Sequence, residues 1–238
     1  MVNPLLKKLA NFTTLSDDER HAVDESCGVV RSLAPREDII VQGQKPASVC
    51  LLLDGFACRY KALEDGRRQI VSFFVPGDLC DLRGFILGRM DHSIGALAAS
   101  RLAIIAPDMV QSLTDRYPKL TRALWWSTLV EEAVLREWIL NLGQRDALER
   151  MGSLFCELLY RFRAAGLLQG DCSFALPLTQ LELGEALGLS AVHANRTLQA
   201  LRRRHLVSFE AGRLTIHDLA ALEQLALFDP DYLHLNSP

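Results

Sequence analysis

The sequence lacks any run approaching the roughly 20 consecutive apolar residues that a membrane-spanning helix needs. The N-terminal segment MVNPLLKKLANF also lacks a long apolar core after its basic residues, so no signal peptide is predicted. Hydrophobic residues make up 49% and charged residues 23% of the 238 positions, which excludes a disordered chain. These absences predict a folded cytoplasmic protein of one large or two ordinary domains, with no membrane contact.

Motifs for metal binding and for catalysis are also missing. The six cysteines form no C-x-x-C pair and no Cys/His cluster with zinc spacing, so no metal site is predicted. Scattered cysteines are typical of small buried side chains in a reducing compartment. No nucleophile motif, phosphate loop or supported carboxylate pair occurs, and the neighbours Asp91 and His92 are common in surface turns. We therefore expect no catalytic residue and no enzyme.

Short β-rich segments alternate with turn signals such as Asp54-Gly55 and Pro76-Gly77-Asp78 between residues 28 and 106. This spacing predicts a compact antiparallel barrel or sandwich. Ahead of it, Ser16 and Glu19 form a capping-box pattern, which predicts a helix that ends near Ser26.

A continuous helical pattern runs from about Lys119 to Leu142, and Asn141-Leu142-Gly143 is predicted to break it. The helix carries two apolar stripes, and two stripes predict two partners: the β domain and a second copy of the chain. The alternative is one wide core face in a monomer. The predicted dimerisation residues are Leu124, Leu135, Ile139 and Leu142.

Asp146 and Glu149 restart a helix that runs to about Ala165, with Gly166 as its cap. The predicted domains are therefore residues 1–115, a dimerisation helix over 116–144, and residues 145–238. The short joint between the two helices is where one domain could swing against the other.

The segment from Pro177 to Val207 predicts a helix-turn-helix. Thr179 and Glu182 form a third capping box, Gly188 allows a tight turn, and Ser190 caps the second helix. Gly184 fits a position where close approach of the second helix excludes a side chain. Two strand-like runs joined by Ala211-Gly212 follow, as in the wing of a winged helix, and Asp218 caps a last helix.

Acidic residues are absent from Ala186 to Phe209, although the net charge of the whole chain is −3. A local basic surface of this kind can bind DNA. Arginine can bond guanine, and asparagine or glutamine can bond adenine, in bidentate fashion. The predicted DNA-binding residues are Ser190, Val192, His193, Asn195, Arg196, Gln199 and Arg203.

On these segments the sequence resembles the Crp/Fnr family of bacterial transcription regulators. Residues 41–79 are similar to the family's β-roll, residues 145–159 to the helix after its hinge, and residues 190–207 to its recognition helix. The resemblance implies an α+β fold with an N-terminal antiparallel, cyclic-nucleotide-binding-like β-roll, a long dimerisation helix and a C-terminal winged helix-turn-helix. It also implies a homodimer on an inverted-repeat operator of double-stranded DNA, with RNA polymerase as a partner. Arg196 matches the family's base-reading arginine, whereas Val192 replaces a glutamate that often reads bases.

The residues expected to line an effector pocket depart from the cyclic-AMP-binding pattern of the family. Asp81-Leu82 replaces a Gly-Glu pair and His92-Ser93 replaces an Arg-Ser pair, while Arg83 lies in the same loop. We therefore expect an effector other than cyclic AMP. The sequence leaves three alternatives for the effector of the β-roll: a small molecule, a haem held through Cys80 or His92, or no ligand. Cys27 alone cannot supply the cysteine cluster of the iron–sulfur members. The rival hypothesis is a ligand-sensing module whose C-terminal domain binds a protein.

Overall fold

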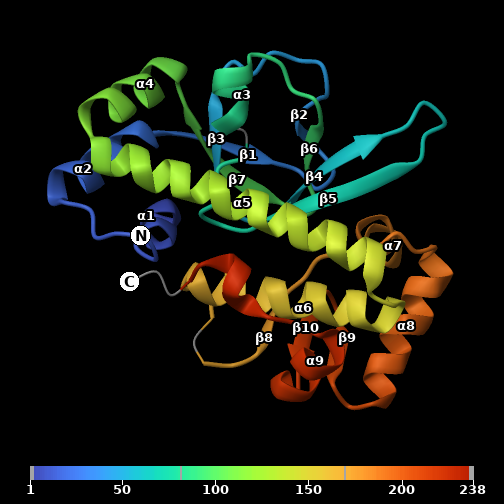
Figure 1. Ribbon diagram of the computed structural model, residues 1–238. Helices are drawn as coiled ribbons and strands as arrows, with labels where there is room; N and C mark the ends of the chain where they lie inside the picture. Colours follow the sequence, from blue (N-terminus) through green and yellow to red (C-terminus); the bar gives the residue numbers. More distant parts are fainter. Residues whose placement is uncertain (1–2, 81, 169, 236–238) are drawn as a thin grey trace. The chain divides into compact units, whose positions relative to one another are not determined.

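The computed structural model describes residues 3–80, 82–168 and 170–235, apart from the side chains of residues 83–85 (Figure 1). The chain forms two compact units. The first contains the residues up to Lys61 and residues 72–131, and the second contains residues 62–71 and 132–234.

Antiparallel strands form the centre of the first unit, as the alternating β-rich segments predict. One sheet has the order β1-β7-β3 and the other the order β2-β6-β4-β5. The strands are β1 (Val29–Leu33), β2 (Asp38–Ile40), β3 (Val49–Asp54), β4 (Ala57–Ala62), β5 (Arg68–Phe74), β6 (Ser93–Ala96) and β7 (Ser100–Ile105).

The turn between β3 and β4 requires the glycine that the sequence places there. Gly55 has a φ of +97°, and a Cβ on it would lie 2.2 Å from Ser100 Oγ. Ser100 Oγ also accepts a hydrogen bond from the Phe56 backbone N–H at 3.3 Å. Because both φ and the available space exclude a side chain, Gly55 fixes the tight turn that takes the chain from β3 in one sheet to β4 in the other.

Four helices pack on the strands: α1 (Pro4–Leu9), α2 (Asp17–Ser26), α3 (Leu82–Leu87) and α4 (Pro107–Arg116). The capping box of Ser16 and Glu19 is present, so the predicted start and end of α2 are confirmed. One apolar cluster joins α1, α2 and α4 to β3 and β7, and a second fills the space between strands of the two sheets. Each buried aliphatic side chain of such a cluster contributes about 1.5–3 kcal/mol.

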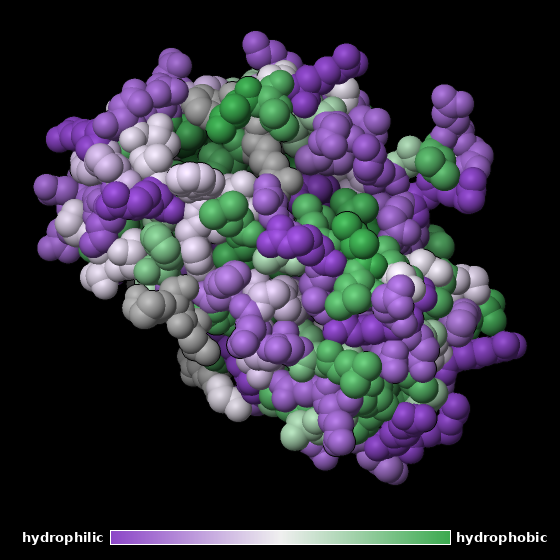
Figure 2. Space-filling view, in the orientation of Figure 1, coloured by the Kyte–Doolittle hydropathy of each residue, from purple (hydrophilic) through white to green (hydrophobic). Residues whose placement is uncertain are grey.

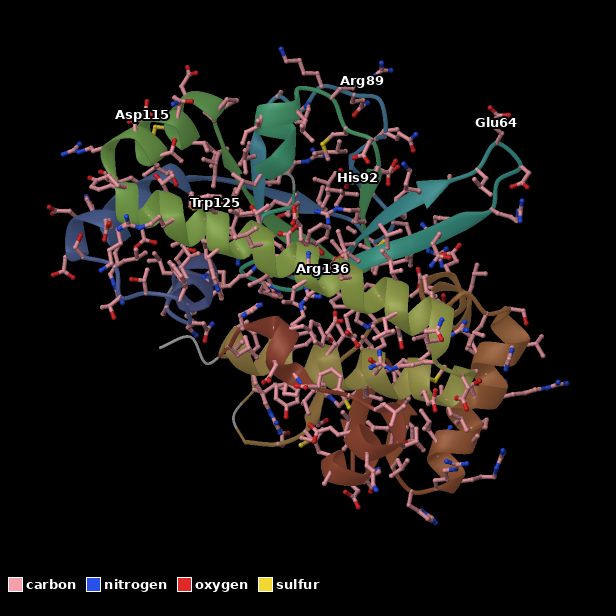
Figure 3. The ribbon with its side chains drawn as sticks, viewed as in Figure 1. Glu64, Arg89, His92, Asp115, Trp125 and Arg136 are labelled. Atoms are coloured by element: carbon pink, nitrogen blue, oxygen red, sulfur yellow. The ribbon has the colours of Figure 1, made fainter. Side chains whose placement is uncertain are left out.

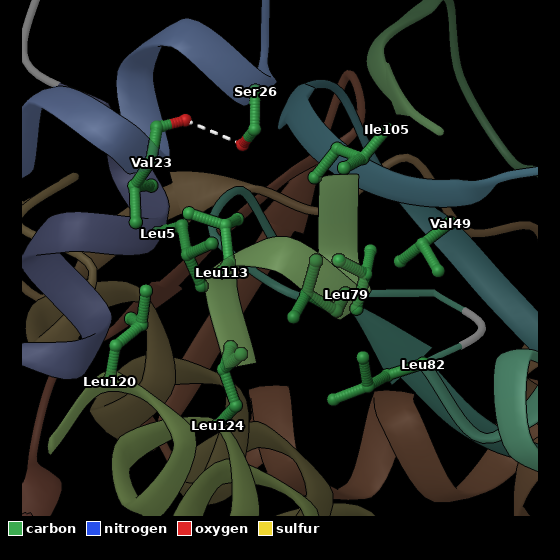
Figure 4. A pocket seen from close by; sticks show the side chains of 11 residues that line it. Leu5, Val23, Ser26, Val49, Leu79, Leu82, Ile105, Leu113, Leu120 and Leu124 are labelled. Atoms are coloured by element: carbon green, nitrogen blue, oxygen red, sulfur yellow. Dashed lines mark hydrogen bonds between the residues drawn. The ribbon is translucent and has the colours of Figure 1, made fainter. Parts of the chain in front are cut away.

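A small apolar cavity of about 20 Å³ lies within the first cluster (Figure 4). Leu82 lines it together with Leu5, Leu79, Leu113 and Leu124. This volume holds about one water molecule at most, so the cavity is a packing gap and not a ligand site.

Helix α5 (Pro118–Gln144) has 27 residues and confirms the long predicted helix, at a length of about 40 Å. The predicted break at Asn141-Leu142-Gly143 is wrong, because α5 continues through these residues to Gln144. A glycine inside a helix costs only about 1 kcal/mol relative to alanine. This cost is too small to end a helix whose residues before and after the glycine are packed against the rest of the chain. The helix ends where Asp146 caps the next one.

The second unit is a winged helix-turn-helix with a supporting helix. Its elements are α6 (Ala147–Ala164), β8 (Ser173–Ala175), α7 (Gln180–Leu187), α8 (Ala191–Arg203), β9 (Val207–Glu210), β10 (Arg213–Ile216), α9 (Leu219–Ala226) and a 3₁₀ turn (Pro230–Leu233). The strand order β8-β10-β9 adds one strand to the predicted two-stranded wing. Strand β8 has only three residues, which is too short for an alternating pattern to reveal it.

A buried carboxylate ties three elements of the second unit together. Glu157 on α6 accepts hydrogen bonds from Trp138 Nε1 at 3.0 Å, from Tyr232 Oη at 3.0 Å and from Arg161 Nη1 at 3.1 Å. Burial raises the pKa of Glu157, and the three donors oppose that rise. The pairing joins the C-terminal half of α5 and the 3₁₀ turn to α6.

The sharp turn between α7 and α8 depends on two glycines. Gly188 caps α7 in the left-handed region at φ 66°. A Cβ on Gly184 would lie 2.4 Å from the carbonyl oxygen of Leu189, so the predicted close approach at this position is confirmed.

We expect Gly184→Ala to destabilise the second unit by about 1–3 kcal/mol, because the clashing atom belongs to the backbone of the turn and cannot move aside. Gly143→Ala is the matched control, since its Cβ would meet nothing within 4 Å and should be neutral or stabilising by about 0.5–1 kcal/mol. Urea unfolding of the full chain, followed by circular dichroism, measures both changes. Equal midpoints for the two variants would contradict the steric role of Gly184.

Candidate functional site

The outward face of α8 carries most of the predicted DNA-binding residues. Ser190 caps the helix by accepting a hydrogen bond from the His193 backbone N–H at 3.2 Å. The helix buries Ala194, Leu198 and Leu201 against its own unit, as the sequence predicts. This packing turns the opposite side of the helix to solvent.

The structure brings four predicted residues together on this exposed side: Val192, His193, Arg196 and, two turns on, Arg203. Val192 is 64% exposed although it is apolar. Asn195 and Gln199 are half-buried at the edge of the face. The Oδ1 atom of Asn195 is buried and accepts no hydrogen bond from the part of the chain that the structure describes. Arg196 is thus better placed than Asn195 to reach a base.

Charge on the helix-turn-helix is arranged to favour an anion. Helix α8 has no acidic residue in its first turn, and its N-terminus carries the positive end of the helix dipole. Glu185 on α7 pairs with Arg68 at 2.6 Å, so its charge is partly neutralised. Arg202 pairs with Glu210 of the wing at 3.1 Å, whereas Arg203 is exposed. Arg203 is therefore the arginine better placed for a phosphate.

A second polar cluster lies inside the first unit, around His92 (Figure 3). Arg59 on β4 is only 5% exposed. Its Nε donates to His92 Nε2 at 3.1 Å, and its Nη2 donates to Glu131 Oε2 at 3.3 Å. The guanidinium also stacks 4.9 Å from the centre of the Phe74 ring. The cluster is a buried cation held between an imidazole and a carboxylate.

The hydrogen bonds define the state of His92. Because Nε2 accepts from Arg59, the ring proton of the neutral form is on Nδ1, which donates to Asp91 Oδ1 at 2.7 Å. The hydrogen bond from His92 is also the main cause that lowers the pKa of Asp91. Both ring nitrogens are engaged, so His92 offers no lone pair for a haem iron.

The effector residues whose side chains the structure describes have different surroundings. His92 and Ser93 are both buried, and Ser93 Oγ accepts from the Gln42 backbone N–H at 2.9 Å. Leu82 instead lines the apolar cavity of Figure 4. Asp81 lies outside the described residues, and so does the side chain of Arg83. Leu82 and His92 thus have different surroundings in this unit, and the effector pocket itself stays a prediction.

Sequence reasoning missed Arg59. A weak signal exists, since this arginine stands in the apolar half of β4, where strand alternation turns side chains inward. Its role depends on Glu131, which is distant in sequence, so composition alone could not reveal it.

The four predicted dimerisation residues differ in how far they are exposed along α5. Leu124 is 8% exposed and belongs to the first apolar cluster of its own chain, which makes it unavailable to a partner. Leu135 and Leu142 are half-buried, and Ile139 is 72% exposed. The other large apolar side chains exposed on the helix are Trp125, Leu129 and Leu140. Figure 2 shows apolar side chains among hydrophilic ones along the path of α5.

Other features also bear on function. Among the described residues, no helix is long and apolar enough to cross a membrane. No group of three or more His, Cys, Asp or Glu side chains in that part of the chain is arranged to hold a metal ion. Cys27 and Cys172 are partly exposed, and the other cysteines are buried.

Comparison with protein families assigns both halves of the chain. Residues 30–117 match the cyclic nucleotide-binding domain, and residues 149–225 match the Crp-like helix-turn-helix domain. A domain of the first kind joined to a helix-turn-helix defines the chain as a DNA-binding transcription regulator.

Similar proteins agree with this class. The transcriptional activator protein FnrL of Cereibacter sphaeroides is 29% identical over 218 residues, which cover 90% of this chain and 87% of FnrL. The nitrogen fixation regulation protein FixK of Bradyrhizobium diazoefficiens is 29% identical over 175 residues, covering 74% of this chain and 72% of FixK. The solved structure of FixK2 from Bradyrhizobium japonicum is 26% identical, covers 83% of this chain and 96% of FixK2, and superimposes with a TM-score of 0.72. The chain belongs to the Crp/Fnr family of transcription regulators.

Proposed function

We propose that this regulator binds an inverted-repeat operator as a homodimer and that its β-roll does not respond to cyclic AMP. The exposed face of α8, with Arg196 at its centre, is the observation that carries the DNA-binding part. Membership of the Crp/Fnr family makes RNA polymerase the expected protein partner of this regulator. Because bacterial operators lie in the cytoplasm, the proposal also places the protein there.

Homodimerisation is supported by the exposed side of α5. Trp125 is 65% exposed and Ile139 72% exposed, although both are large apolar residues. Exposed apolar stripes of this kind commonly mark an interface. A two-fold dimer presents two recognition helices, so its half-sites lie about one helical turn of DNA apart.

We expect Ile139→Asp to separate the protomers and abolish operator binding, because it places a carboxylate on the exposed stripe. Ile139 is exposed and lies outside α7 and α8, so we expect the helix-turn-helix to stay folded in this variant. Sedimentation at micromolar concentration measures the association. A wild-type monomer that still binds one half-site tightly would contradict the homodimer.

We expect Arg196→Ala to weaken operator binding by about 1–3 kcal/mol, with the loss concentrated at one base pair in each half-site. Arg203→Ala is the contrasting variant: it should weaken all DNA sequences alike and reduce the salt dependence, as loss of a phosphate contact does. Binding titrations on duplexes with single substitutions, at several salt concentrations, separate the two effects. If Arg196→Ala weakens binding to every duplex equally, base reading by Arg196 is contradicted. If binding of the wild-type protein to duplex DNA does not depend on salt, the rival hypothesis of a protein partner is favoured.

The argument against cyclic AMP comes from Arg59. A buried cyclic phosphate needs a cation and several hydrogen-bond donors. The buried guanidinium of Arg59 already binds the Glu131 carboxylate and the His92 ring. A phosphate beside Arg59 would have to displace Glu131 or share the site with a second negative charge. The His92 ring accepts a hydrogen bond from Arg59 through Nε2, so it brings no further donor to that side of the site.

We therefore expect isothermal titration with cyclic AMP or cyclic GMP to show no binding at micromolar concentration. Glu131→Gln is the diagnostic variant, since it removes the competing carboxylate while keeping the size of the side chain. Nucleotide binding that appears only in this variant would locate the obstacle at Glu131. Micromolar binding to the wild-type protein that also raises operator affinity would overturn the expectation.

A further inference from the structure

The junction between α5 and α6 is built around a buried arginine. Arg145 stands between Gln144, where α5 ends, and Asp146, which caps α6. Only 7% of its surface is exposed, although a connection between two helices ordinarily lies at the protein surface. A charged side chain is almost never buried unless it is paired. The burial of Arg145 therefore requires partners for its guanidinium.

The guanidinium of Arg145 binds the ends of two helices that are far apart in the sequence. Its Nη1 donates to Glu137 Oε1 at 2.6 Å and to Asn141 Oδ1 at 3.4 Å, both on the last turns of α5. Its Nη2 donates to the backbone carbonyl oxygen of Leu227 at 2.8 Å, where α9 ends. One planar group thus pairs with a carboxylate of α5 and satisfies a carbonyl at the end of α9.

The backbone of Arg145 extends the junction to the helix-turn-helix. Its carbonyl oxygen accepts a hydrogen bond from Arg150 Nε at 2.9 Å. Arg150 Nη1 also donates to the carbonyl oxygen of Leu187 at 3.0 Å, at the last residue of α7. Asn141 Nδ2 in turn donates to the backbone carbonyl oxygen of Arg150 at 3.3 Å. Two arginines therefore connect the end of α5 to the turn that leads into α8.

Helices α5 and α6 are joined a second time, away from the junction. Trp138 Nε1 donates to Glu157 Oε2 at 3.0 Å, and the two residues are 7% and 2% exposed. A swing of α6 about residues 144–146 would separate this pair and would pull Arg145 away from Leu227. A buried charge that loses its partners is strongly unfavourable. The last turns of α5 and the whole of α6 are therefore held together.

We propose that Arg145 is a positioning residue for operator binding, because it holds the last turns of α5, helix α6 and the end of α9 as one rigid body. The short joint after α5 then does not act as a hinge, in contrast to the swing that the sequence alone favours. This role rests on the proposed binding of a two-fold operator. A rigid junction gives α8 one direction relative to the end of α5, so half-sites at a single spacing fit both recognition helices.

Amide hydrogen exchange of the full-length protein tests the rigid junction without DNA. Arg145→Met removes the donors and keeps a long side chain, so exchange over residues 137–150 should become about tenfold faster or more as local opening becomes easier. Exchange over residues 154–159, in the middle of α6, should not change. Arg20→Met, on an exposed position of α2, controls for the loss of one positive charge.

A lysine variant keeps the exchange test decisive if Arg145→Met unfolds the whole unit. Arg145→Lys retains the charge but lacks the planar fork that reaches both Glu137 and Leu227, so its exchange over residues 137–150 should lie between wild type and Arg145→Met. Exchange over these residues that is the same in wild type, Arg20→Met and Arg145→Lys would overturn the rigid junction.

Duplexes with altered half-site spacing test the positional role. The probe is an inverted-repeat duplex that the wild-type protein selects from randomised DNA. One added base pair rotates a half-site by about a tenth of a helical turn, so the wild-type protein should bind the altered duplex about tenfold more weakly or worse. Arg145→Met should bind the selected duplex more weakly than wild type and should distinguish the two spacings less, because loosely held modules reach either one.

The ratio of the two affinities separates positioning from stability. A variant that is only less stable loses affinity for both duplexes by the same factor, so an unchanged ratio in Arg145→Met would overturn the positional role. Failure of the wild-type protein to select any inverted-repeat duplex would overturn the proposed operator binding and the positional role together. The exchange measurement would still decide in that case whether the junction is rigid.

Discussion

Helix α5 has to bury side chains along its whole length, and an α-helix offers a single continuous face for that purpose. Ser127, Val134 and Asn141 lie on the buried face, and each is seven residues from the next. The exposed side of the helix carries the large apolar residues Trp125, Leu129 and Ile139. The packing of one side of the helix therefore leaves an exposed and partly apolar surface on the other.

The interior of the β-roll shows why membership of a family does not identify an effector. Arg59 is a buried cation of the kind that could bind an anionic ligand, but a carboxylate of α5 and an imidazole of the roll occupy its donors. The same scaffold can host unrelated ligands when a few interior side chains change. The contact between Arg59 and Glu131 also links the roll to α5.

Features that depend on short stretches of chain were predictable. The capping boxes at Ser16, Asp146 and Thr179 mark helix starts correctly, because a cap and its partner lie three residues apart and need no tertiary context. Errors arose where packing overrides local preference. Gly143 does not end α5, and Leu124 turns into its own core instead of toward a partner.

The sequence by itself determined the order of the elements, the winged helix-turn-helix and the outward position of Arg196 on α8. These follow from periodicity, caps and turn glycines, which are encoded within a few residues. Only the tertiary structure decided which stripe of α5 is free, that Leu82 lies away from His92, and that Arg59 meets Glu131. Each of these features depends on contacts between residues that are far apart in the sequence. A local sequence pattern cannot predict which of those residues will pack together.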